Sequence, residues 1–280
     1  MPSCNDRVIR VTHLFPTLDK KLLELLRGLT PAEWEMPTIA KLWRVKDIAS
    51  HLLDGNLRTL STSRDGFSEI PDVNIANYQD LVGFLNQLNA DWTKATRRIS
   101  PQVLIELLEL TGKLFCEHMA KADLSAEAIF PVSWAGETTS VNWFHIAREY
   151  TEKWIHQQQI RDAVGKQDLF SKELFYPMID TLMQALPHAY KDLDALTGTA
   201  IKIEIDTAAG GIWFLNKEDI GWCLSSEIKG GLAAEICMDP HTAWKVFSKG
   251  ISPEEARSRV LINGNKMLAE NTLRMVAVMA

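Results

Sequence analysis

The spacing of apolar residues predicts helices over most of the first 165 residues. KKLLELLRGL and WRVKDIASHLLDGNLRTL repeat apolar side chains every three or four positions, the period of a helix that buries one face. Three longer helical stretches are expected at about residues 75–98, 101–121 and 141–164, and the last is followed by Gly165, a usual helix stop. The long amphipathic helices together predict a four-helix bundle.

After Gly165 the pattern becomes strand-like. TAIKIEID alternates apolar and polar residues with period two, and GIWFLN, GWCLSS and LAAEICMD are further strand candidates separated by turn residues. Helices are expected at ELFYPMIDTLMQALPHAYKDL, which Pro187 should end or kink, and at AWKVFSK and NKMLAENTLRMVAVM. The predicted fold class is therefore α+β, with a bundle domain at residues 1–167 and a small domain with an antiparallel sheet at residues 168–280.

Composition excludes several classes of partner. A net charge of −6 argues against electrostatic binding to nucleic acid or to an anionic membrane. No apolar run is long enough to cross a bilayer, and MPSCNDRVIR carries a charge pair where a signal peptide needs an apolar core. The four cysteines form no CxxC pair or other ligand spacing, so we expect reduced thiols in a cytoplasmic protein.

A polar stripe on the last bundle helix is the candidate for chemistry. At about 100° per residue, one face carries His145, Glu149, Glu152, His156 and Gln159. Glu152 and His156 are one helical turn apart, a spacing that lets a carboxylate and an imidazole bind one divalent ion.

A metal site needs a third ligand, which in a bundle should come from a facing helix. His51 is the best candidate, because its stripe continues through Gly55, which leaves space, to Arg58. The alternative is a solvated helix face, since one ExxxH match is weak and a single histidine is more often structural or exposed. His145 and Glu149 would either orient the ligands or form a solvated pair. The remaining histidines are interpreted as structural or exposed: His13, His118, His188 and His241.

WRVKDIASHLL followed by REYTEKWIHQQQIRDAVG resembles the N-terminal metal-binding domain of mycothiol-dependent maleylpyruvate isomerases, within the DinB-like superfamily. TPAEW…PT…LW fits the same pattern, and DPHTAWKVFSKGISPEEARSRVLINGN resembles, more weakly, the small sterol-carrier-like α/β domain that follows in these isomerases. The resemblance implies that His51, Glu152 and His156 hold one Zn²⁺ or similar ion. It also implies a low-molecular-weight thiol cofactor such as mycothiol.

In such isomerases the thiolate adds to an activated double bond, the bond rotates, and elimination releases the trans product. The same site could instead run a thiol S-transfer. The isomerases also use an arginine from the C-terminal domain, for which Arg257, Arg259 and Arg274 are the available choices. We take Arg58 and Arg257 as the candidate cofactor-binding cations.

The expected function is thus a metal-dependent, thiol-dependent isomerase or transferase acting on a small-molecule substrate. One alternative is a non-enzymatic small-molecule-binding module with a structural or vestigial metal, supported by the apolar run GIWFLN. Another is a metal-dependent hydrolase that uses bound water. The sequence leaves open the substrate, the metal, the catalytic residues and the oligomeric state.

Overall fold

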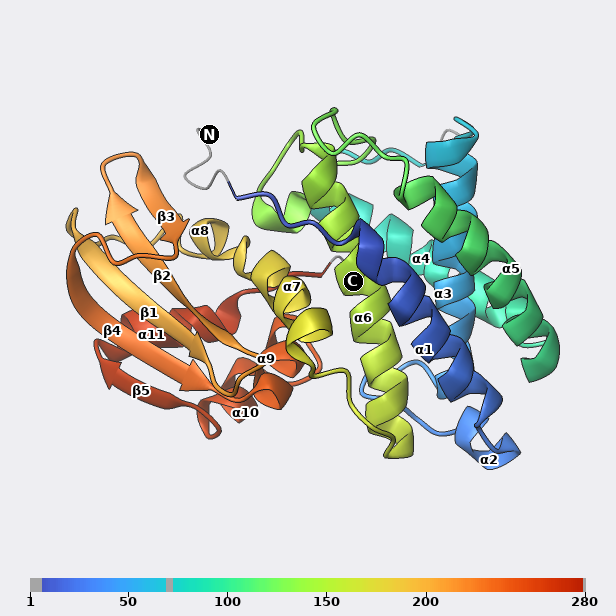
Figure 1. Cartoon of the computed structure of the whole chain (residues 1–280). Coiled ribbons are helices and arrows are strands. Elements are labelled where there is room, and N and C mark those ends of the chain that lie inside the picture. Colours follow the sequence, from blue (N-terminus) through green and yellow to red (C-terminus); the bar gives the residue numbers. More distant parts are fainter. Residues whose placement is uncertain (1–6, 69–72, 279–280) are drawn as a thin grey trace. The chain divides into compact units, whose positions relative to one another are not determined.

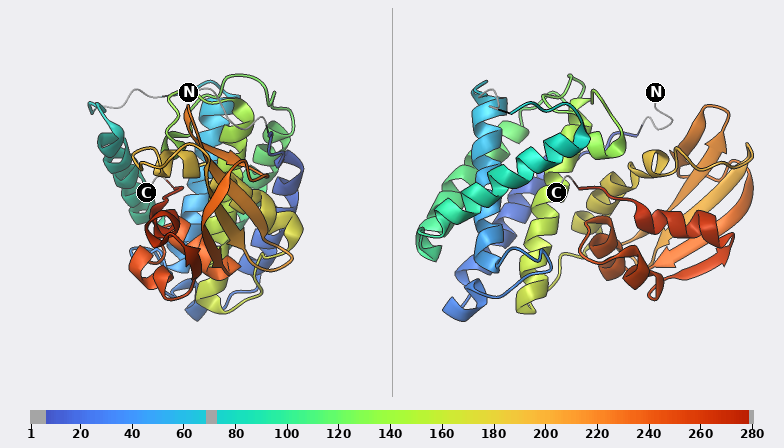
Figure 2. Two further views of the ribbon diagram at one scale, coloured as in Figure 1. Left: turned by 90° about the vertical axis from the view of Figure 1, so that its left-hand side faces the viewer. Right: turned by 180° about the vertical axis from the view of Figure 1, so that it is seen from behind.

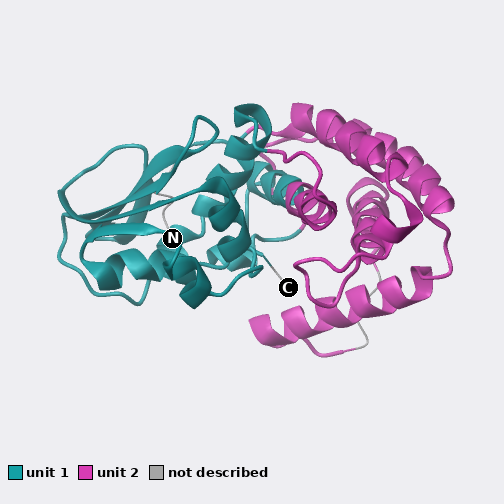
Figure 3. Ribbon diagram, turned by 90° about the horizontal axis from the view of Figure 1, so that it is seen from below, with its two compact units in different colours: residues 1–9, 130–151, 170–278 teal, residues 10–129, 152–169, 279–280 magenta. Residues whose placement is uncertain are grey.

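The computed structural model describes residues 7–68 and 73–278, which form two compact units (Figure 1). Unit 2 contains residues 10–129 and 152–169, and unit 1 contains residues 7–9, 130–151 and 170–278 (Figure 3). The change of unit after residue 169 lies beside the boundary predicted near residue 168. Whether the two sides of that boundary fold independently stays a prediction.

Unit 2 is the helical bundle predicted for the N-terminal half. Its helices are α1 (Phe15–Arg27), α2 (Pro31–Trp34), α3 (Val45–Thr59), α4 (Tyr78–Thr96), α5 (Pro101–Met119) and the second part of α6 (Asn142–Val164). The long helices α1, α3, α5 and α6 share one buried apolar core, to which they contribute Leu26, Ile48, Leu104 and Ile160. This burial of one face of each helix is what the helical period predicted. No helix in the described part of the chain is long and apolar enough to span a membrane.

Helix α4, predicted at about residues 75–98, packs on the bundle in a different way from the other long helices. Its buried side chains are polar, namely Asn89, Thr93 and Thr96, while Trp92 is only partly buried against the core. Thr96 Oγ1 lies 2.5 Å from Ser50 Oγ, and Trp92 Nε1 donates to the Ser50 carbonyl at 2.8 Å. Hydrogen bonds therefore join α4 to α3, and the leucines of α1 fill the core instead.

Unit 1 is built on one sheet with the strand order β3-β2-β1-β4-β5. The strands are β1 (Thr199–Ile205), β2 (Gly211–Glu218), β3 (Gly221–Ser225), β4 (Gly231–Met238) and β5 (Leu261–Gly264). The helices of this unit after residue 170 are α7 (Lys172–Met183), α8 (Leu186–Ala189), α9 (Pro240–Phe247), α10 (Pro253–Arg257) and α11 (Lys266–Asn271), seen from two sides in Figure 2. Ile201, Ile203 and Ile205 of β1 are buried, as its period-two pattern predicted.

Two details of unit 1 refine the prediction. The helix expected to end or kink at Pro187 is divided into two, because α7 ends at Met183 and Pro187 lies in the first turn of α8. Strand β5 was not predicted. It is only four residues long and mostly exposed, with Leu261 73% exposed, so it carries no apolar alternation.

The predicted antiparallel sheet is wrong at one interface, since β1 and β4 pair in parallel while the other three pairs are antiparallel. The cause is the connection from β3 to β4, because residues 226–230 cross to the far side of β1 instead of turning back beside β3. Asn216, which is 2% exposed, holds this crossing by donating to the Glu227 carbonyl at 3.1 Å and accepting from Lys229 N at 2.9 Å.

The cysteine prediction is also corrected. Cys223 is disulfide-bonded, Cys116 and Cys237 are free thiols, and Cys4 lies outside the described residues. Spacing along a sequence does not determine which thiols meet in a fold. Burial raises the pKa of the Cys116 thiol to about 11, so this thiol is uncharged at neutral pH and a poor nucleophile.

Replacing Gly230 should destabilise the crossing connection. A Cβ at Gly230 would lie 1.9 Å from the carbonyl oxygen of Gly198, whereas a Cβ at Gly231 would lie 4.0 Å from the same oxygen. Gly230→Ala should therefore lower the free energy of unfolding by about 2 kcal/mol or more, and Gly231→Ala by less than about 0.5 kcal/mol. Urea denaturation of both variants measures the difference. Equal losses would show that the close approach to Gly198 is not the constraint.

Candidate metal centre

Helix α3 carries His51 on its buried side, and hydrogen bonds hold the loop that precedes this helix. Thr38 donates to the Trp43 carbonyl twice, from its backbone nitrogen at 3.2 Å and from its hydroxyl at 2.8 Å. Arg44 N then donates to Asp47 Oδ2 at 3.1 Å, which closes the first turn of α3. The Trp43 ring lies 4.7 Å from the His51 ring, and one turn further along, a Cβ at Gly55 would meet nothing within 4 Å.

Helix α6 places Glu152 and His156 on one face, one turn apart. Nε2 of His156 lies 3.2 Å from Oε2 of Glu152, and the two side chains are 14% and 33% exposed respectively. The Trp43 ring lies 5.8 Å from the His156 ring as well as beside His51. His156 is therefore mostly buried and Glu152 partly so, which the solvated-face alternative does not predict.

The two helices bring the predicted residues together. The ligand atoms of His51, Glu152 and His156 all lie within 4.8 Å of one another, and the two imidazole rings are 4.6 Å apart at an angle of 75°. Among the described residues this is the one group of three or more His, Cys, Asp or Glu side chains with such an arrangement. All three residues belong to unit 2.

The chemistry of these donors suits a divalent transition metal. Two imidazole nitrogens and one carboxylate oxygen form the ligand set of many catalytic zinc sites and leave a coordination position open. Nδ1 of His51 is buried without a hydrogen-bond partner among the described residues, which is costly unless something binds it. Burial, the nearby His156 and Arg58 hold the pKa of His51 well below its usual value. Its ring is therefore neutral at pH 7, as a metal ligand must be.

His145 and Glu149, the other acid and imidazole of the predicted stripe, are joined by an arginine in unit 1. Nη2 of Arg148 donates to Nδ1 of His145 at 2.9 Å and to Oε1 of Glu149 at 2.6 Å. The Arg148 and Glu149 side chains are 14% and 18% exposed. These residues form a mostly buried ion-paired cluster, which a solvated pair would not. Their role in orienting the ligands stays a prediction.

The two arginines predicted to bind a cofactor already have carboxylate partners. Nε of Arg58 lies 2.9 Å from Asp54 Oδ2, one turn earlier on α3, and the Arg58 side chain is 45% exposed. Arg257, at the end of α10 in unit 1, donates from Nε to Glu270 Oε1 at 2.6 Å. Either guanidinium would bind an anionic ligand through its remaining donors or by exchanging this partner.

The other histidines do not join the metal-competent group. His118 Nε2 lies 2.8 Å from Ser63 Oγ, and the His241 ring packs edge-on against Phe170 at 4.5 Å.

Sequence reasoning missed the position of Trp43, because helical periodicity does not place a loop residue. It put Gln159 on the stripe without a role, although Gln159 Oε1 lies 2.9 Å from Nδ1 of His156.

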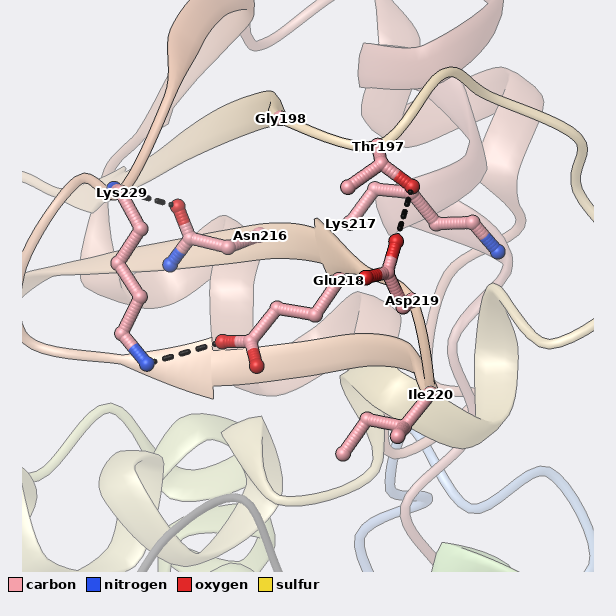
Figure 4. A pocket seen from close by; sticks show the side chains of 8 residues that line it. All are labelled: Thr197, Gly198, Asn216, Lys217, Glu218, Asp219, Ile220 and Lys229. Carbon is pink, nitrogen blue, oxygen red and sulfur yellow. Dashed lines mark hydrogen bonds and ion pairs between the residues drawn. The ribbon is translucent and has the colours of Figure 1, made fainter.

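A pocket of about 350 Å³ lies in unit 1, and none of the candidate metal-binding or cofactor-binding residues lines it (Figure 4). It is lined by Thr197, Gly198, Asn216, Lys217, Glu218, Asp219, Ile220 and Lys229. Several of its polar groups bond to one another, since Thr197 donates to Asp219 at 3.0 Å and Lys229 donates to Glu218 at 2.9 Å. The lining contributes no residue to the group of His, Cys, Asp or Glu side chains that could hold a metal ion among the described residues.

The fold and the site define a helical-bundle protein with a His-Glu-His cluster, followed by a mixed-sheet unit. The family model for the mycothiol maleylpyruvate isomerase N-terminal domain matches residues 15–161, more than half of the 280 residues. The chain belongs to this family. The matched segment includes His51, Glu152 and His156.

Two solved structures resemble nearly the whole chain. The crystal structure of the mycothiol-dependent maleylpyruvate isomerase has a TM-score of 0.56 at 12% identity, over 94% of this chain and 96% of that chain. A histidine-to-alanine mutant of that enzyme gives a TM-score of 0.51 at the same identity and coverage. At this identity the likeness shows the fold alone, and it confirms the predicted α+β class with the helical domain first. No curated protein sequence matches the chain.

The stability of the protein should fall in acid because of His145. Burial, reinforced by Arg148 and opposed by Glu149, lowers the pKa of His145 to about 4. The folded protein holds this ring neutral, so its contribution is complete above the unfolded pKa of about 6.5 and is lost as the pH falls towards 4. Between pH 7 and pH 5 this residue should cost about 2 kcal/mol of unfolding free energy.

His145→Gln keeps an acceptor for Arg148 but cannot be protonated in this range. Urea denaturation at both pH values should therefore show a smaller acid loss in the variant than in the wild type. An identical acid loss in both proteins would contradict the assignment of this pH dependence to His145.

Proposed function

We propose that this protein is a metal-dependent enzyme that uses a low-molecular-weight thiol, mycothiol or a close analogue, to isomerise a small unsaturated acid. The observation that carries the proposal is the convergence of His51, Glu152 and His156 within the segment matched by the family model. A thiol S-transfer on the same residues is the nearest variant of this proposal.

A bound divalent ion would lower the pKa of a coordinated thiol or water and so supply a nucleophile at neutral pH. The chain's own residues prepare the site for it. His51 is kept neutral by burial, Glu152 supplies the negative charge, and Trp43 lies beside both imidazole rings, where it excludes water. Arg58, two turns after His51 on α3, would attract an anionic group of the thiol or substrate.

The described cysteines support an external thiol. Burial raises the pKa of Cys116 and of Cys237, and Cys223 is disulfide-bonded. None of these three sulfurs is a ready thiolate at neutral pH. A cytoplasmic location belongs to the proposal, because a thiol cofactor must stay reduced, although the disulfide at Cys223 is unusual for that compartment.

The purified protein should contain about one divalent transition-metal ion per chain. His156→Ala should abolish metal binding because it removes a ligand, while His188→Ala should leave it unchanged, since His188 lies outside the cluster. Elemental analysis after dialysis measures both. Full metal occupancy in His156→Ala would refute the ligand assignment.

The affinity for an anionic thiol should depend on Arg58. Loss of one charge-assisted hydrogen bond in Arg58→Gln should weaken thiol binding about tenfold, and a comparable loss in Arg257→Gln would assign Arg257 to the same site. Calorimetry with a panel of low-molecular-weight thiols measures the thiol affinity of each variant.

An assay for cis–trans isomerisation then tests the activity. Hydrolysis without added thiol would favour the hydrolase alternative, and ligand binding without turnover would favour the binding module.

A further inference from the structure

We propose that Gln159 is a positioning residue for the metal ligand His156. Its amide oxygen holds the Nδ1–H of the imidazole and thereby turns the Nε2 lone pair towards Glu152 and the open site. The inference rests on the proposed metal site, but its geometry can be tested without a metal.

The two nitrogens of His156 face different partners. Nδ1 lies 2.9 Å from Gln159 Oε1, and Nε2 lies 3.2 Å from Glu152 Oε2. An amide oxygen can only accept a hydrogen bond, so Nδ1 carries the proton in this arrangement. With Nδ1 protonated, Nε2 is the nitrogen left to bind a metal ion, and it is the atom that faces the carboxylate ligand. Gln159 is 5% exposed, so water competes little for this bond.

Gln159 is one of three consecutive buried glutamines, and only this one contacts a candidate ligand. Gln158 donates to Asp168 Oδ1 at 2.6 Å and accepts from Leu169 N at 3.0 Å, which fastens the chain where it leaves α6. Gln157 is 1% exposed, and neither of its amide atoms has a partner among the described residues. Gln157 and Gln158 are therefore matched controls of the same size, chemistry and helix.

His51 has no comparable hydrogen bond, because its Nδ1 is buried without a partner among the described residues. Its ring is instead confined by the rings of Trp43 and His156, at 4.7 and 4.6 Å. The two imidazole ligands are thus oriented by different means. The Gln159 hydrogen bond therefore acts directly on His156 and reaches His51 only through the contact between the two rings.

Gln159→Met removes the acceptor with little change in volume, and Gln159→Glu keeps an acceptor. Competition with a chelator for Zn²⁺ and Co²⁺ should show about 10- to 100-fold weaker binding in Gln159→Met. Gln159→Glu should bind no more than about threefold more weakly than the wild type. Gln158→Met should lower stability, because it removes two hydrogen bonds, but it should leave the metal affinity of the folded protein unchanged. Gln157→Met should also leave the metal affinity unchanged. Wild-type affinity in Gln159→Met, or equal losses in all three methionine variants, would overturn the proposal.

Nitrogen NMR of histidine-labelled, metal-free protein gives an independent readout at alkaline pH, where histidine rings are neutral. The wild type and Gln159→Glu should show a larger fraction of His156 with its proton on Nδ1 than Gln159→Met, in which Glu152 is the remaining acceptor and draws the proton to Nε2. If the wild type takes up no metal but this shift occurs, the positioning role stands and the proposed function fails. If the wild type binds metal and Gln159→Met changes neither affinity nor tautomer, the positioning role alone fails.

Discussion

The burial of two imidazole rings against each other is the constraint on which the candidate site depends. His51 and His156 lie 4.6 Å apart on facing helices, and neither has free access to water. Protonating both would place like charges together in poorly solvated surroundings, and the pKa of His51 is lowered accordingly. With His51 neutral, the Glu152 carboxylate contributes negative charge to the site. A divalent cation balances that charge and also satisfies the buried nitrogen.

Helical geometry explains why the three candidate ligands could be predicted from sequence. A four-residue spacing fixes Glu152 and His156 on one face whatever the tertiary fold, and His51 followed from the need for a third ligand on a facing helix. The resemblance to a known family supported the same three positions. Periodicity could not place Trp43, since its position depends on a loop held by Thr38. Hydrogen bonds within a loop produce no periodic pattern of apolar residues in the sequence.

In the fold as well, local sequence patterns predicted the elements but not how they pair. Alternation predicted β1, and apolar segments between turn residues predicted β2, β3 and β4. It could not predict the parallel pairing of β1 with β4, which depends on the path of residues 226–230 past Asn216. Helix α4 shows a similar limit of sequence patterns. Its length and spacing resemble those of a core helix, but its buried contacts are polar, so propensity identified the helix while packing chose α1 for the core.

Cationic side chains of α6 could compete with a metal ion for the Glu152 carboxylate, but they bind other partners. Lys153 is adjacent to Glu152 in the chain, but its ammonium donates to Asn56 Oδ1 at 2.5 Å and lies 4.2 Å from the centre of the Phe115 ring. Arg161 donates to backbone carbonyls of Gln167 and Lys21. A lysine or arginine aimed at Glu152 would pair with the carboxylate that a metal ion needs. Because a helix separates neighbouring residues by about 100°, Lys153 lies on another side of α6 than Glu152. Arg148, one turn before Glu152 on the same side, is instead paired with Glu149 and His145.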